Sequence, residues 1–190
     1  MDDVERIFRD SGAMLEGHFL LTSGRHSPVY WEKFRILEHP RLLEQLCYLI
    51  VEHFSAHKID LVAGPTLGGA IIAFEVARQT GIRAAFAERG DSGRTFRRGL
   101  GIIRGERVLI VDDVLTTGGS VLEVITAVKQ LGGQVIGVGI LVNRSEKPID
   151  LGVTLYSCHQ AQAVSYPPDS CPLCQSHIPL VKMGGDKAPS

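Results

Sequence analysis

The sequence has little of what marks several classes of protein. Its 190 residues contain one tryptophan and 6% aromatic residues, and the formal net charge is −1. No apolar run approaches the roughly 18 residues of a membrane span. Met1 is followed by two aspartates rather than by a basic and an apolar stretch, so we expect no signal peptide and no membrane segment. This near-neutral composition is typical of a globular protein of the cytoplasm, without a global sign of a nucleic-acid partner.

Cysteine is also scarce. The four cysteines are Cys47, Cys158, Cys171 and Cys174. In a cytoplasmic chain they are expected to be thiols or metal ligands rather than disulfides. Cys171 and Cys174 form one C-x-x-C, half of a zinc knuckle, which Cys158, His159 or His177 would have to complete. We favour structural thiols and keep zinc at Cys171 and Cys174 as the alternative. His18, His39, His53 and His57 are expected on the surface or at helix ends.

The middle of the chain alternates strand and helix patterns. Strands are predicted over 59–63, 83–87, 107–111, 134–142 and 153–156, and helices over about 40–57, 70–77 and 121–131. This order predicts an α/β fold, with a Rossmann-like parallel sheet flanked by helices. A short helix and a hairpin around Thr22–Arg25 precede it. We expect one domain over 1–190, with a core of about 40–145 and a small hood from about 1–38 plus 146–183.

The strongest local pattern spans residues 108–120. An apolar strand ends in Asp112 and Asp113, a Thr/Gly loop follows, and Ser120 with Glu123 has the spacing of a capping box that would begin a helix. Backbone N–H groups at a helix N-terminus bind phosphate, and two carboxylates beside them suit sugar hydroxyls or a divalent cation. A ribose 5-phosphate meets both demands. The plainer alternative is a capped strand followed by an ordinary turn. The glycine-rich motifs of other nucleotide sites are absent from the sequence.

Residues 108–120 resemble the phosphoribosyl-pyrophosphate (PRPP) signature of type I phosphoribosyltransferases. The whole chain is similar to the orotate phosphoribosyltransferases, through 24–28, 64–68, Asn143-Arg144 and the Cys171–Cys174 tail. The resemblance implies the type I fold and transfer of phosphoribosyl from PRPP to orotate in pyrimidine (UMP) biosynthesis. It also implies Mg²⁺ bound through PRPP rather than by side chains, and a homodimer with shared active sites. No nucleic acid and no membrane are expected as partners.

The resemblance also assigns residues. The catalytic set would be Asp112, Asp113, Arg97 and Arg98. The PRPP-binding set would be Asp112, Asp113, Val114, Leu115, Thr116, Thr117, Gly118, Gly119, Ser120, Pro65, Thr66, Gly68, Arg89 and Arg94. The orotate-binding set would be Thr116, Arg144, His26, Tyr30 and Trp31. A planar guanidinium suits a carboxylate and a ring carbonyl in one plane, which supports the place of Arg144.

Residues 89–107 are rich in arginine and glycine, which favours a mobile basic loop that closes over the leaving group. The alternative is a solvated basic hairpin. Many orotate enzymes carry Lys and His in this loop, whereas this chain has neither between Lys58 and Lys129. Gly68 and His26 also stand where many relatives have Lys. Arg94, Arg97 and Arg98 would then stabilise the leaving group without acting as proton donors.

Three other functions remain open from sequence. One is the same reaction with a purine base, which Arg144 and the hood segment disfavour. Another is a regulatory PRPP sensor that binds nucleic acid, which the neutral charge disfavours. The third is a paralogue with an inactive loop, which the missing Lys and His keep open.

Overall fold

A computed structural model describes residues 3–21, 23–91, 93–97, 99, 101–161 and 164–183. Its larger sheet has six strands in the order β5-β4-β3-β6-β7-β8. The strands are β3 (Leu61–Pro65), β4 (Arg83–Gly90), β5 (Gly93–Phe96), β6 (Arg107–Leu115), β7 (Gln134–Asn143) and β8 (Thr154–Gln160). Every neighbouring pair is parallel except β4 and β5. The predicted parallel α/β sheet is therefore confirmed.

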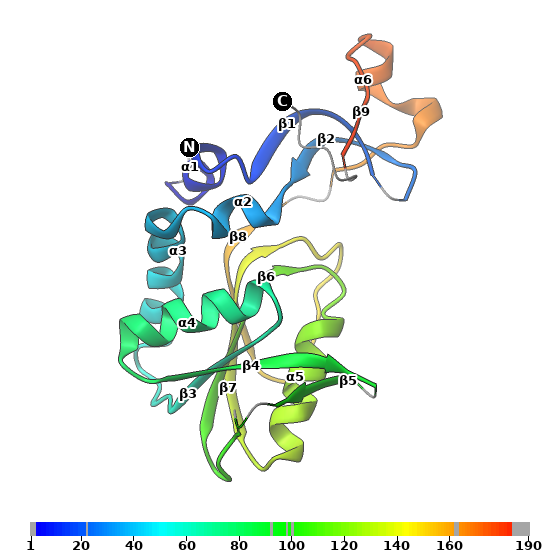
Figure 1. Ribbon diagram of the computed structural model, residues 1–190. Helices are drawn as coiled ribbons and strands as arrows, with labels where there is room; N and C mark the ends of the chain where they lie inside the picture. The colour runs from blue at the N-terminus through cyan, green and yellow to red at the C-terminus, as the bar shows by residue number, and fades with distance from the viewer. Residues whose placement is uncertain are drawn as a thin grey trace.

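Helices cover both faces of this sheet (Figure 1). Helices α3 (Pro40–His53) and α4 (Gly68–Thr80) lie on one face and α5 (Gly119–Gln130) on the other. Buried side chains of β3 alternate accordingly, because Leu61 and Ala63 pack with the α5 cluster while Val62 packs with the α3 and α4 cluster. Both faces are therefore apolar, which leaves the ends of the strands as the place for polar chemistry.

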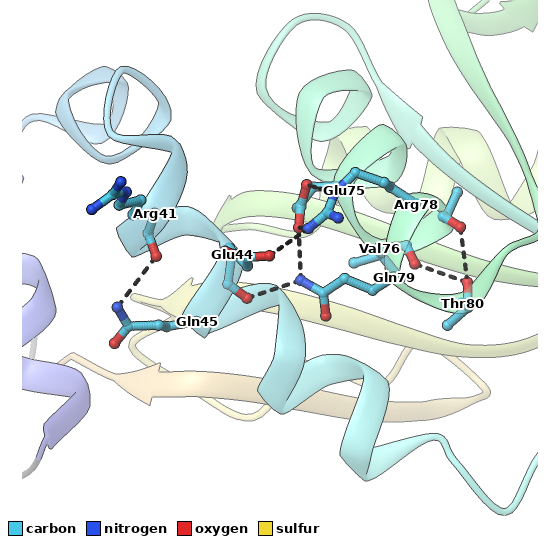
Figure 2. Close-up of polar contacts among 9 residues, drawn as sticks. Arg41, Glu44, Gln45, Glu75, Val76, Arg78, Gln79 and Thr80 are labelled. Carbon is cyan, nitrogen blue, oxygen red and sulfur yellow. Dashed lines mark hydrogen bonds and ion pairs between the residues drawn. The ribbon is translucent and has the colours of Figure 1, made fainter.

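Helices α3 and α4 are also joined by polar contacts at their exposed edge (Figure 2). The Arg78 guanidinium donates to the carboxylates of Glu44 and Glu75, and the Gln79 amide donates to the Glu44 carbonyl oxygen. Such exposed ion pairs contribute only about 0.2–1 kcal/mol each. The apolar packing beneath them therefore holds the helices, and the polar contacts fix how they align.

The smaller sheet has the order β2-β1-β9 and gathers both ends of the chain. Strands β1 (Met14–Leu20) and β2 (His26–Trp31) form an antiparallel hairpin, and β9 (Val181–Lys182) pairs parallel to β1. Short helices accompany it, namely α1 (Asp3–Asp10), α2 (Lys33–Leu37), the 3-10 turn η1 (Pro168–Ser170) and α6 (Pro172–Gln175). Figure 1 shows this hood beyond one end of the large sheet. Thr22, in the predicted turn, lies outside the described residues.

Several predicted boundaries were wrong. Strand β6 continues through Asp112 and Asp113 to Leu115, because it keeps pairing with β7 there. Strand β8 belongs to the large sheet, although it lies in the segment assigned to the hood. Part of the segment 89–107 forms β5, which pairs with β4 as a hairpin, in agreement with the alternative given for this segment. None of the described helices combines the length and apolar character needed to cross a bilayer.

The predicted capping box at Ser120 and Glu123 is also wrong. Helix α5 begins one residue earlier, after Gly118 in the left-handed conformation with φ 80°, and no side chain caps it. The Glu123 carboxylate instead lies 3.7 Å from Nε of Arg94 on β5. The first N–H groups of α5 therefore remain available for a ligand.

Candidate active site

The site lies where the connections of the large sheet change direction. Strand β3 leads into α4 on one face, and its neighbour β6 leads into α5 on the other face. The two strands pair only as far as Ala63 and Ile110. Beyond these residues their carboxyl ends separate, which is where open α/β sheets bind ligands.

Two buried carboxylates stand at this point. Asp112 is 7% and Asp113 4% exposed. The Asp113 backbone N–H donates to Asp112 Oδ1 over 2.9 Å, and the Val114 N–H donates to Asp113 Oδ1 over 2.7 Å. These bonds hold each carboxylate in one orientation. Burying two adjacent acids lowers stability unless a ligand or polar partners use them, so the pair marks a functional site.

Glycines allow the start of α4 to approach the acids. A Cβ atom at Gly68 would collide with Asp113 Oδ2. One at Gly69 would lie 2.6 Å from Pro65 Cδ and 3.1 Å from Asp112 Oδ1. The backbone after β3 thus passes directly against the carboxylates, which no residue with a side chain could do without displacing them.

A cavity of about 300 Å³ opens between these elements. It is lined by Trp31, Pro65, Thr66, Leu67, Gly68, Arg94, Asp112, Asp113, Val114, Thr116, Ser120 and Arg144. Residues from β3, β6, α5 and the hood therefore meet in one space. The N-terminus of α5 borders it through Ser120, and a helix N-terminus with neighbouring hydroxyls favours an anion.

A second cavity of about 620 Å³ lies between the hood and the core. Its lining comprises Leu21, Ser23, Arg25, Ser27, Val29, Trp31, Thr116, Thr117, Arg144, Ser145, Glu146, Lys147, Pro148, Ile149, Val164 and Ser165. Trp31, Thr116 and Arg144 line both cavities. The site therefore has a part that is suited to an anion and an adjoining part that the hood covers.

Arg144 stands between the two parts. It follows β7, and its backbone N–H donates to the Leu115 carbonyl oxygen over 2.8 Å. Burial lowers the pKa of its guanidinium, which nevertheless stays charged at neutral pH. Within the described part of the chain no carboxylate forms an ion pair with it. A half-buried cation without an acidic partner is suited to an anionic ligand.

The basic segment contributes one residue to the described cavity lining. Arg94 donates from Nη1 to the Thr66 carbonyl oxygen over 3.1 Å and to the Thr66 hydroxyl over 3.0 Å, so it supports the loop after β3. Arg89 and Arg97 do not line either cavity, and Arg97 is exposed. Arg98 lies outside the described residues.

Two residues predicted to contact orotate face elsewhere. Alternate residues of β2, namely Ser27, Val29 and Trp31, line the hood cavity, whereas His26 and Tyr30 have the opposite parity and do not. The ring of Tyr30 lies 5.6 Å from that of Phe19.

Three residues of the predicted PRPP-binding set also lie away from the cavities. Leu115 is buried in the core, and Gly118 and Gly119 form the turn into α5 without lining either cavity.

Sequence reasoning missed the loop after Arg144. Residues 145–149 line the hood cavity, as do Val164 and Ser165. The loop follows the carboxyl end of β7, so the rule that placed the acids would also have found it. Residues 164–165 carry no such signal, because only the fold brings them beside β2.

Comparisons with known proteins agree with this geometry. The family model described as "Phosphoribosyl transferase domain" matches residues 35–170. The chain is 50% identical over 186 residues to an orotate phosphoribosyltransferase of Pelotomaculum thermopropionicum, covering 98% of each chain.

Solved structures agree as well. The crystal structure of orotate phosphoribosyltransferase from Aeropyrum pernix superposes with a TM-score of 0.70 at 26% identity, over 83% of this chain and 93% of that one. The Mycobacterium tuberculosis enzyme in complex with PRPP gives 0.67 at 25% identity, over 84% of this chain and 96% of that one.

Proposed function

The chain belongs to the orotate phosphoribosyltransferases of the phosphoribosyl transferase domain family, and from that premise we propose how its site works. It transfers the 5-phosphoribosyl group of PRPP to orotate, which yields orotidine 5′-phosphate and pyrophosphate in pyrimidine biosynthesis. The observation that carries the choice of base is Arg144. A purine offers no carboxylate, whereas orotate is flat and anionic and would satisfy this half-buried guanidinium.

We assign the PRPP groups to the smaller cavity. Asp112 and Asp113 would accept hydrogen bonds from the ribose hydroxyls. Thr116 and Ser120, with the N-terminus of α5, would bind the 5-phosphate. The loop after β3, supported by Arg94, would bind the pyrophosphate. Orotate would lie in the adjoining part, between Arg144 and the Trp31 side of the hood.

With the substrates placed in this way, orotate displaces pyrophosphate from the ribose in one step. A ring nitrogen of orotate attacks the anomeric carbon while the bond from that carbon to the pyrophosphate oxygen breaks. Positive charge develops on the ribose, and the negative Asp112 and Asp113 stabilise it because they are already oriented by their backbone hydrogen bonds. The hood keeps water away from the reacting carbon, because water at this position would hydrolyse PRPP.

Magnesium fits this donor set as a partner of PRPP rather than as a resident ion. Asp112 and Asp113 supply only two neighbouring carboxylates, and Mg²⁺ in phosphate sites is held by one or two carboxylates together with substrate oxygens and water. When bound, it would neutralise charge on the departing pyrophosphate.

The test is the loss of orotate absorbance on mixing the protein with PRPP, Mg²⁺ and orotate, with adenine, hypoxanthine and uracil in parallel. Magnesium-dependent loss of orotate alone supports the proposal. Consumption of another base would move the chain to a different substrate. PRPP binding without turnover would favour a sensor or an inactive paralogue.

We further propose a single phosphoribosyltransferase domain that acts as a cytoplasmic homodimer with shared active sites. Four cysteines without disulfides suit a reducing compartment. Native mass spectrometry tests the dimer. Complementation between Asp113→Asn and Arg97→Ala chains in mixed dimers tests whether the basic loop serves the neighbouring site, because sharing would restore one intact site per dimer.

A further inference from the structure

Four metal-ligating side chains converge in the hood, away from the proposed active site. They are His18 of β1, His26 of β2, and Cys171 and Cys174 around the start of α6, and their ligand atoms lie within 4.8 Å of one another. None of them lines either cavity of the active site. We propose that they bind one structural zinc ion, which fastens the C-terminal tail to the N-terminal hairpin.

The distances fit a tetrahedral ion. With usual zinc bond lengths, the edges of a tetrahedron are about 3.3 Å between two nitrogens and about 3.6 Å between nitrogen and sulfur. His18 Nε2 lies 3.6 Å from Cys171 Sγ and 3.8 Å from Cys174 Sγ, and His26 Nδ1 lies 3.3 Å from Cys174 Sγ. The two nitrogens are 2.9 Å apart. A bound ion requires them to separate by only a few tenths of an ångström.

The expectation that His18 lies on the surface was wrong, because the residue is only 1% exposed. Its hydrogen bonding presents the correct nitrogen to the ion. Its Nδ1 lies 2.8 Å from the Ile178 carbonyl oxygen, which can only accept. Nδ1 therefore carries the proton, and Nε2 directs its lone pair toward His26 and the two thiols. Zinc-bound histidines commonly donate their second ring N–H to a carbonyl in this way, which fixes the ring.

The choice of metal and its role follow from the ligands. The two negative charges of two thiolates, with two neutral imidazoles, balance the charge of a divalent cation, and this set in tetrahedral arrangement favours zinc. Each thiol releases one proton when the ion binds. Four protein ligands leave no open position for a substrate, so the ion is structural rather than catalytic.

Hydrogen bonds join the tail to the first hairpin, but apolar packing adds little to them. Of its described residues 164–183, Cys171 alone is buried. Strand β9 has two residues and α6 has four. Such a segment buries too little apolar surface to be stable by packing, and small modules of this kind rely on a metal or disulfides. The zinc ion would supply the missing stability.

The same strand links this site to the active site. His26 and Ser27 are consecutive in β2, so their side chains lie on opposite faces, one toward the zinc ligands and the other toward the hood cavity. His26 also exchanges backbone hydrogen bonds with Tyr166, next to Ser165 of the cavity lining. Loss of the ion is therefore expected to loosen the roof over orotate and raise its KM more than it lowers kcat.

The first test is the metal content of the whole protein, purified after growth with zinc. We expect one zinc per chain in the unaltered protein and in the control variant His177→Asn, since His177 lies in the tail outside the cluster. Cys174→Ser removes a direct ligand, so its zinc affinity should fall by more than about 100-fold. This loss exceeds the one usually caused by removing a residue that only hydrogen-bonds to a metal ligand. Equal zinc content in Cys174→Ser and the unaltered protein would overturn the site.

A second measurement avoids dependence on a variant that fails to fold. Metal-free unaltered protein is titrated with Co²⁺, and tetrahedral ligation by sulfur and nitrogen should give intense visible bands together with a thiolate charge-transfer band. Their absence, or a Cys171–Cys174 disulfide in freshly purified protein, would overturn the proposal. Both readouts are independent of orotate turnover, so failure here leaves the proposed enzymatic function untouched.

Discussion

At the scale of single residues, the contact between Gly68 and Asp113 gives a sharp prediction. Alanine near a helix start is normally favourable, but a Cβ at residue 68 would collide with the Asp113 carboxylate. We expect Gly68→Ala to destabilise the protein by about 1–3 kcal/mol and to lower kcat/KM by about 10²-fold through displacement of the carboxylate. Urea unfolding and steady-state kinetics measure both.

Gly101→Ala is the matched control, because a Cβ at residue 101 meets nothing within 4 Å. It should leave activity unchanged. An active Gly68→Ala protein of full stability would contradict the assigned packing of α4 against the acids.

Asp113→Asn removes one negative charge while keeping the shape of the side chain. Stabilisation of the developing ribose cation should fall, so we expect kcat to drop by about 10²-fold or more. Thermal unfolding should change little. Asp10→Asn, on the exposed end of α1, serves as the control. Full activity of Asp113→Asn would exclude the proposed role.

The residues of the site differ in how far sequence could predict them. Asp112, Asp113 and Thr116 are close in sequence, so their spacing alone predicts a shared site. His18 and Cys171 are 153 residues apart, and only the completed hood brings them together. The resemblance predicts that His26 contacts orotate. In the structure, side chains of β2 point alternately to its two faces, and His26 lies on the face of the proposed zinc ligands. This face could be assigned only from the strand register.

At the scale of elements, β5 holds the loop after β3 through Arg94. Arg94→Lys keeps the charge but loses the fork that reaches both the carbonyl and the hydroxyl of Thr66. We expect kcat/KM for PRPP to fall by about 10-fold or more, as for loss of a charged hydrogen bond. Arg83→Lys, an exposed partner of Glu106, is the control. A greater loss in Arg97→Lys than in Arg94→Lys would instead favour the basic loop as a closing lid.

The start of β6 depends on Asp60, which predicts a dependence on pH. Its carboxylate accepts hydrogen bonds from the backbone and guanidinium of Arg107, and these lower its pKa. Because the pKa of Asp60 is lower in the folded than in the unfolded protein, its ionised carboxylate stabilises the fold at pH values above about 4, the pKa of the unfolded chain. This stabilisation is lost as the pH falls below that value toward the pKa of the folded protein. Asp60→Asn should therefore be less stable at pH 7, with a difference that shrinks toward acidic pH. A difference that stays constant with pH would contradict this.

Helices and strands were predictable where the periodicity of apolar residues is strong. They were less predictable where contacts between distant elements determine the local structure. The apolar runs of β3, β6 and β7 and the helical spacing of α4 and α5 are strong local signals. The capping box failed because the left-handed turn at Gly118 starts α5 before Ser120, and Glu123 lies near Arg94 of another element instead. Strand β5 was expected only as the alternative basic hairpin, because its stability comes from pairing with β4 rather than from its own glycine- and arginine-rich sequence.

At the scale of the whole molecule, the four thiols should divide into two classes. Cys47 is fully buried, and burial raises its pKa. Burial also raises the pKa of Cys158 to about 12, and its thiol donates to the Leu46 carbonyl oxygen. At pH 8 both thiols remain protonated, but only Cys47 is fully buried, and Cys158 is half-buried. Cys47 should react with iodoacetamide only as fast as the core opens, and Cys158 should react slowly because little of its thiol is ionised.

After chelation of metal, Cys174 should react first because it is exposed. Mass spectrometry of labelled peptides follows each cysteine separately. Labelling of Cys47 as fast as Cys174 would show that α3 does not pack stably on the sheet in solution.

The pairing of the first hairpin with the distant tail also sets an order of events during synthesis. Translation adds about 5–20 residues per second, so His18 is added to the chain roughly 8–30 s before Cys171. During that interval the nascent chain exposes two histidines and an unpaired edge of β1, while the six-stranded sheet folds behind them. The hood is thus the last part of the molecule to mature, and its assembly follows the supply of zinc in the cell.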